Sequence, residues 1–83
     1  MNQEYTNLKK IIKYRASYSG TKETDIIYKK LIMNKLDIFN IKELKLLIDL
    51  FIEISDVEIF NILKKNIKKP KKFEKLINKI LDV

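Results

Sequence analysis

Apolar residues recur three and four positions apart along most of the chain, and no stretch alternates between apolar and polar residues as a strand does. Tyr5, Leu8 and Ile12 begin this pattern and predict a helix over residues 4–17. The same spacing returns in four further segments, whose ends are marked by residues that cap or interrupt helices. The patterning alone therefore predicts an all-α fold.

The second segment, residues 21–37, takes its apolar side from Tyr28, Ile32 and Leu36, which lie four positions apart. Thr21 is placed to cap this helix, because its hydroxyl can accept a hydrogen bond from a backbone N–H of the first turn. Acidic residues follow in that turn, where the positive end of the helix dipole favours them. We expect the helix to fade at the end of this range.

Two further helix starts carry stronger signals. Asn40, with a glutamate three residues later, has the spacing of a capping box and predicts a helix over residues 41–53. Ser55 is followed by a glutamate at the same distance and predicts a helix over residues 56–67.

Pro70 marks the start of a fifth helix, over residues 70–82, because proline lacks an N–H and presets the backbone for a first helical turn. Five short helices with tight connections predict a compact five-helix bundle. A chain of 83 residues forms one domain at most, so we expect a single helical domain over residues 1–83.

The sequence contains neither Cys nor His. This composition excludes structural disulfides, thiolate nucleophiles, proton relays through His and the usual ligands of zinc. The remaining polar residues have no evident activating partner in the sequence, so we expect that the protein is not an enzyme. No apolar run reaches the ~18 residues of a membrane span, and no signal peptide is visible, which predicts a cytoplasmic protein.

The formal net charge is +7, and seven of the twelve residues from Lys64 to Lys75 are Lys. Such a segment can bind nucleic acid, an anionic membrane or an acidic protein, or it can be a solvated face in a Lys-rich chain. Nucleic-acid surfaces usually add Arg or stacking aromatic residues, and this segment has only Phe73, which the helical pattern predicts to be buried. We expect no nucleic-acid partner, and the alternative is a small basic helical module that binds nucleic acid or another acidic partner through Lys64–Lys75.

The segment from Tyr14 to Asp25 contains Arg15, the only Arg of the chain, and Gly20, its only Gly. Gly20 lies between two predicted helices and can serve as a plain helix stop. Arginine supplies a rigid fork of donors that Lys cannot copy, so Arg15 and Glu23 around one glycine could also form a surface that recognises a partner.

The order Tyr-Arg-x-x-x-x-Gly-Thr-Lys-Glu-x-Asp in this segment resembles the bacterial FAD assembly factor family SdhE, whose mitochondrial relative is the succinate dehydrogenase flavinylation factor. The family signature at this corner is Arg-Gly-x-x-Glu. Gly20 and Glu23 match it, Asp25 matches the Asp that follows, and Tyr14 and Arg15 match an aromatic-basic pair upstream.

Two later segments are also similar to the family. Residues 36–44 resemble its Leu-Asp-x-Leu-Ser-x-x-Glu-Leu helix entry, and residues 56–63 resemble its Asp-Pro-Asp-Leu-aromatic-x-Trp-Leu helix. Two positions depart from the pattern: Ser19 stands where the signature has Arg, and Ile62 stands where many members have Trp. The loss of the Arg removes a cation from the corner.

The resemblance implies a small monomeric five-helix protein that binds the flavoprotein subunit of succinate dehydrogenase, or of fumarate reductase in some bacteria. It implies that this factor promotes covalent attachment of FAD to a His of the subunit. The factor itself then holds no cofactor tightly. The partner-binding residues implied by the resemblance surround the corner and are Tyr14, Arg15, Tyr18, Ser19, Gly20, Glu23 and Asp25.

Overall fold

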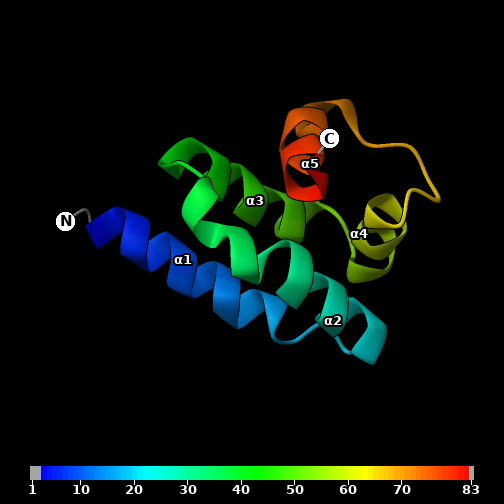
Figure 1. Ribbon diagram of the computed structural model, residues 1–83, viewed down its shortest axis with the longest axis horizontal. Coiled ribbons are helices and arrows are strands. Elements are labelled where there is room, and N and C mark those ends of the chain that lie inside the picture. Colours follow the sequence, from blue (N-terminus) through cyan, green and yellow to red (C-terminus); the bar gives the residue numbers. More distant parts are fainter. Residues whose placement is uncertain (1–2, 83) are drawn as a thin grey trace.

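The computed structural model describes residues 3–82, and every regular element in that range is helical (Figure 1). The α-helices are α1 (Gln3–Ala16), α2 (Lys22–Leu31), α3 (Ile41–Glu53), α4 (Asp56–Leu63) and α5 (Glu74–Leu81). Two short 3-10 helices join them, η1 (Met33–Ile38) and η2 (Lys71–Phe73). The expected all-α, single-domain bundle is confirmed, while residues 1, 2 and 83 of the predicted domain lie outside the described range.

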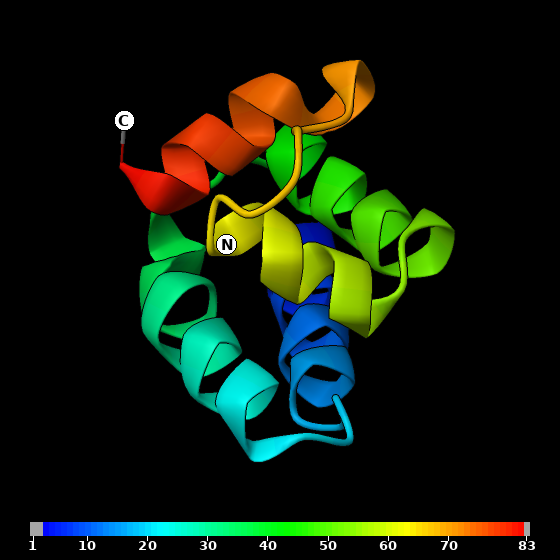
Figure 2. The same cartoon turned by 90° about the vertical axis from the view of Figure 1, so that its right-hand side faces the viewer.

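The helices enclose one core. α1 packs along α3, α2 packs on α4, and α5 contacts α3. In Figure 2, α5 lies across the top of the molecule and the connection from α1 to α2 lies at the bottom. Each α-helix contributes fully buried apolar side chains, such as Ile12, Tyr28, Leu47, Ile59 and Ile77. Burial of each such side chain stabilises the fold by about 1.5–3 kcal/mol.

The predicted helix starts are confirmed. The Thr21 hydroxyl accepts a hydrogen bond from the Thr24 N–H, and Ser55 accepts one from the N–H three residues later. At α3 the capping box is complete: the Asn40 side chain accepts from the Glu43 N–H at 2.8 Å, and the Glu43 carboxylate accepts from the Asn40 N–H at 2.8 Å. α3 has the predicted bounds, and α1 begins and ends one residue before its prediction.

The predicted second helix, 21–37, is wrong in its second half. α2 ends at Leu31 and the chain continues as the 3-10 helix η1. A 3-10 helix has three residues per turn, so residues three apart lie on the same side. Leu36 of η1 is buried, with 3% of its surface exposed. Phe39, which follows η1 in extended backbone, is buried as well, with 2% exposed.

The predicted fourth helix, 56–67, extends too far. α4 ends at Leu63, and Lys65 adopts a left-handed conformation with φ of 63°. The Asn66 N–H then donates back to the Asn61 carbonyl at 2.8 Å, which is the closure that ends many helices at a left-handed residue. Ile67 consequently lies outside the helix and is 44% exposed.

The predicted fifth helix, 70–82, begins as expected next to Pro70, but its first turn is the 3-10 helix η2. α5 then ends at Leu81, where Asp82 takes a left-handed conformation with φ of 62°. The burial of Phe73, which is 2% exposed, is confirmed.

Candidate functional site

The corner between α1 and α2, residues 17–21, is shaped by Gly20. Its φ is 87°, a backbone conformation that residues with a side chain rarely adopt. Apart from Gly20 itself and its two chain neighbours, no heavy atom lies within 4 Å of the place where a Cβ would be. The glycine is therefore required by the turn and not by packing within the protein, and the side of the backbone that a side chain would cover is open.

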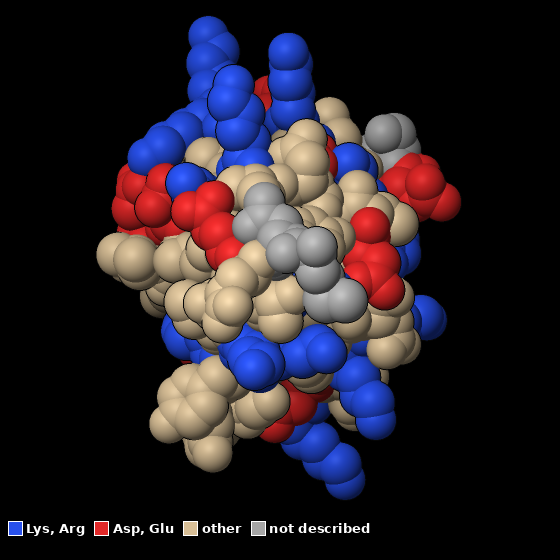
Figure 3. Space-filling view, turned by 90° about the vertical axis from the view of Figure 1, so that its left-hand side faces the viewer, with Lys and Arg blue, Asp and Glu red and all other residues tan. Residues whose placement is uncertain are grey.

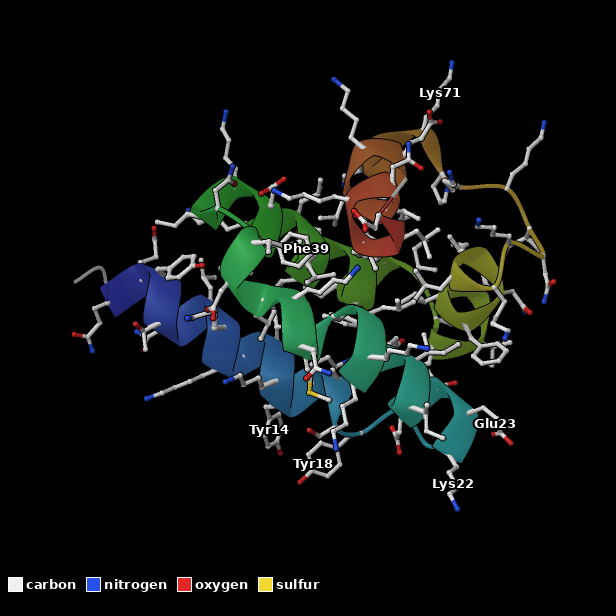
Figure 4. All side chains as sticks on the ribbon, viewed as in Figure 1. Tyr14, Tyr18, Lys22, Glu23, Phe39 and Lys71 are labelled. Carbon is white, nitrogen blue, oxygen red and sulfur yellow. The ribbon has the colours of Figure 1, made fainter. Side chains whose placement is uncertain are left out.

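An aromatic pair precedes the corner. Tyr14 and Tyr18 lie one helical turn apart, with their ring centroids 5.0 Å from each other. The two residues are 71% and 68% exposed, and both project from the lower edge of the molecule in Figure 4. Exposed aromatic side chains are enriched at protein–protein interfaces, because they bury a large area at a small entropic cost.

Glu23 lies on the other side of the corner, exposed in the first turn of α2 (Figure 4). It lines an open hollow of about 260 Å³ between the start of α2 and the side of α4. Val57 and Phe60 form the α4 side of this hollow, and Val57 is 67% exposed. The hollow offers an apolar surface beside an acidic group.

Arg15 is engaged inside the protein. Its Nη2 donates to Asp56 Oδ1 at 2.9 Å, and its guanidinium lies over the Phe51 ring, 5.1 Å from the centroid. The side chain is 34% exposed, and Nη1 is buried without a hydrogen bond to any described residue. Arg15 thus ties α1 to the start of α4, and only part of its surface faces solvent.

Tyr28 completes this network through a contact with Asp56 that no local sequence pattern predicts. Its hydroxyl donates to Asp56 Oδ1 at 2.6 Å, so one carboxylate oxygen receives hydrogen bonds from both α1 and α2. Burial, followed by the hydrogen bond to Asp56, raises the pKa of Tyr28 well above its usual range and keeps the phenol protonated. The carboxylate also lies in the first turn of α4, where the helix dipole favours negative charge.

Ser19 and Asp25 order the corner from within. The Ser19 hydroxyl lies within hydrogen-bonding distance of two acceptors, the Asp25 carboxylate and the Thr21 carbonyl, the latter at 3.0 Å. Asp25 is partly buried. These contacts connect the corner to the first turn of α2. They are made by Ser19, the position at which the family signature has an Arg.

The structure therefore divides the seven expected partner-binding residues. It brings four of them, Tyr14, Tyr18, Gly20 and Glu23, to exposed positions around one corner. The other three, Arg15, Ser19 and Asp25, make hydrogen bonds within the protein and hold the corner in shape. We call the four exposed residues, together with the hollow beside Glu23, the corner surface.

The Lys-rich segment lies away from the corner surface. Figure 4 places Lys71 at the upper edge of the molecule, opposite Tyr14, Tyr18 and Lys22. Lys72 pairs with Glu53 on α3, and Lys69 with Asn78 on α5. The other Lys residues of the segment make no ion pair within residues 3–82.

Among residues 3–82, no three acidic side chains gather in a cluster that could hold a metal ion. None of the helices described is long and apolar enough to cross a membrane. No protein-family model matches the sequence, and no curated protein and no solved structure matches it significantly.

Proposed function

We propose that this protein is an assembly factor that binds the flavoprotein subunit of succinate dehydrogenase, or of fumarate reductase, and promotes covalent attachment of FAD to that subunit. It would act in the cytoplasm, before the subunit joins its complex. The observation that carries the proposal is the corner surface: the residues that match the family's motif include three, Tyr14, Gly20 and Glu23, that lie exposed around one glycine turn, and Tyr18 is exposed beside Tyr14.

The corner surface is suited to docking on a protein. Tyr14 and Tyr18 present two adjacent rings, and the open side of Gly20 leaves room for a partner's backbone to approach. Glu23 adds a charged acceptor next to the hollow formed by α2 and α4. A central aromatic anchor with a polar neighbour is the usual composition of an interaction hot spot.

Arg15 and Asp25 have positioning roles in this proposal. Arg15 fixes the end of α1 on α4 through Asp56, and Asp25 holds Ser19 against the start of α2. A corner held on both sides is preorganised, which lowers the conformational cost of binding.

In the proposed reaction, the flavin and the subunit's own His supply the covalent chemistry. The factor contributes only binding. It can favour one conformation of the subunit over another only by binding that conformation more tightly. This division of labour agrees with a chain that contains neither His nor Cys.

The test is covalent flavin on the subunit, measured as flavin fluorescence of the denatured subunit band, in cells lacking this protein and complemented with variants. We expect Gly20→Arg and Tyr14→Ala to reduce both co-purification with the subunit and its covalent flavin. Glu23→Ala is expected to weaken both by about tenfold, the effect of a hydrogen bond to a charged group.

Glu74→Ala is the matched control, because Glu74 is also an exposed acid in the first turn of a helix but lies on α5. It is expected to leave binding and flavinylation unchanged. The proposal fails if deletion of this protein leaves covalent flavin on the subunit unchanged, or if Glu74→Ala and Glu23→Ala act alike.

A further inference from the structure

The positive charge of this protein is concentrated in one segment. Residues 64–75 contain seven Lys and one acidic residue. The rest of the chain has ten Lys and one Arg against ten acidic residues, so it is close to neutral. A Lys-rich composition alone would spread the excess charge evenly. We call residues 64–75 the basic surface.

The fold presents this charge to solvent. After α4 ends at Leu63, the chain crosses to α5 on the outside of the bundle (Figures 1 and 2). Lys and Arg side chains, drawn in blue, project from the upper end of the face in Figure 3, and Figure 4 labels Lys71 at the upper edge of the molecule. Five Lys residues of the basic surface have neither an ion pair nor a side-chain hydrogen bond with any residue of the described range: Lys64, Lys65, Lys68, Lys71 and Lys75.

The basic surface is amphipathic. Ile67 lies between pairs of Lys in the sequence and is 44% exposed. An open hollow of about 630 Å³ beside it is lined by Ile62, Ile67, Glu74 and four Lys residues. Apolar surface surrounded by ammonium groups matches a ligand that has both an acidic head and an apolar body, as a phospholipid does.

Nucleic acid matches this surface less well. Single strands are bound by aromatic side chains that stack on bases, and the only aromatic residue here, Phe73, is 2% exposed. Base edges of duplexes are read most often by Arg, and the only Arg of the chain lies in α1. Attraction to lipid headgroups needs only point charges close to the surface, which Lys supplies.

We propose that the basic surface docks this protein on an anionic lipid bilayer, with the Lys ammonium groups among the headgroups and Ile67 at the boundary of the acyl chains. The inference does not rest on the proposed function. Figure 4 places Lys71 at the edge of the molecule opposite Tyr14 and Tyr18, so a molecule docked through that edge keeps these two rings exposed to a protein partner.

The experiment is co-sedimentation with vesicles of phosphatidylcholine alone and with about 30 mol% phosphatidylglycerol, at ~0.1 M salt, where charges farther away than a Debye length of ~10 Å are screened. We expect binding to the anionic vesicles that is at least about tenfold stronger than to the neutral ones, and that weakens as salt is raised.

Two sets of four Lys→Gln substitutions form a matched pair with equal change in net charge. The test set is Lys64, Lys68, Lys71 and Lys75. The control set, exposed Lys residues on α1 and α2 without ion pairs in the described range, is Lys10, Lys13, Lys29 and Lys30. The test set is expected to weaken binding by about 100-fold or more, and the control set by less than about threefold.

The apolar contact has its own pair of variants. Ile67→Ser is expected to weaken vesicle binding by about fivefold, because it removes a partly exposed apolar side chain from the membrane boundary. Ile52→Ser is the control, since Ile52 is 76% exposed and lies beside α1. All variants are checked by circular dichroism, and their exposed positions leave the core intact.

Equal binding to neutral and anionic vesicles, or equal losses in the two Lys sets, overturns the proposal. Full competition by glycerol phosphate overturns it in favour of a site for a free phosphate ester. Binding of single-stranded RNA at ~0.15 M salt that displaces the vesicles and is lost in the test set overturns it in favour of a nucleic-acid surface.

Discussion

Asp56 is the residue whose loss should most disturb the region below the corner surface. Its Oδ1 accepts hydrogen bonds from Arg15 and Tyr28, which belong to two different helices. Asp56→Ala removes both bonds at once and leaves the Tyr28 hydroxyl, in a residue that is 0% exposed, without its partner. α1, α2 and α4 would then be held together here by apolar packing alone.

The cost can be estimated from these contacts. A buried donor left without a partner costs about 1–3 kcal/mol. The Arg15 bond contributes only about 1 kcal/mol, because a guanidinium that is 34% exposed regains water when it is released. The favourable position of the carboxylate at the start of α4 adds about 0.5 kcal/mol. Asp56→Ala should therefore lower the free energy of unfolding by about 3 kcal/mol, a large share of the stability of so small a domain.

The assay is urea unfolding at pH 7 followed by circular dichroism, with Asp56→Ala, Tyr28→Phe and the double variant. Tyr28→Phe alone should cost about 1 kcal/mol, since it deletes the hydroxyl without leaving an orphaned donor. The double variant should be less destabilised than the sum of the two single variants, with a coupling of at least about 1 kcal/mol. A loss below ~0.5 kcal/mol for Asp56→Ala, or additive losses, would refute the reasoning.

Tyr28 also gives this network a pH dependence. Its folded pKa is raised above that of the unfolded chain, so its contribution is fully present below the unfolded pKa of ~10 and is lost as pH rises beyond it. The free energy of unfolding should fall in alkali, and Tyr28→Phe should reduce that fall. Equal alkaline slopes for the two proteins would show that the phenol is not held protonated by the fold.

Three further predictions follow from local geometry. Gly20→Ala should cost about 1 kcal/mol in urea unfolding, because φ of 87° is strained for alanine although its Cβ has open space, and Gly20→Asn should cost less. Burial alone would raise the pKa of Glu43, but hydrogen bonds from Lys79 and the Asn40 N–H outweigh burial and lower that pKa. The contribution of Glu43 to the free energy of unfolding is therefore present above the unfolded pKa of ~4.3 and is lost as pH falls. Glu43→Gln should make the free energy of unfolding fall less steeply in acid. Leu47→Ala, at a fully buried position of α3, should cost about 2–5 kcal/mol, and a loss under ~1 kcal/mol would contradict the core described above.

The parts of the fold that the sequence predicted are those set by local signals. The period of the apolar residues located α1 and α3, and the cap at Asn40 located a helix start to the residue, because its partner lies only three positions away. The predicted helix ends were wrong where no characteristic residue, such as Gly or Pro, marks the end of the helix. α4 is followed by a left-handed Lys65 and not by a glycine, and the change from α2 to the tighter turns of η1 is marked by neither Gly nor Pro.

The candidate site divides along the same line. Tyr14 and Tyr18 lie four positions apart, the spacing of neighbours on one helix face, and the structure places their ring centroids 5.0 Å apart. The role of Arg15 could not be predicted, because its partner Asp56 lies 41 residues away and is one of eleven acidic residues in the chain. The single Arg of the chain does mark an important position, but its role is an internal contact with Asp56 that holds α1 on α4.

The division between exposed and engaged residues also changes what the corner surface can recognise. Ser19 stands where the family signature has Arg, and Arg15 is paired to Asp56, so neither residue presents a free cation at the corner. The exposed basic residue next to Glu23 in the sequence is Lys22. The aromatic rings and the apolar hollow then supply most of the contact area, and such contacts respond weakly to salt. Docking on a bilayer through the basic surface depends steeply on salt. Raising the ionic strength should therefore release the protein from anionic vesicles while leaving its complex with the proposed subunit intact.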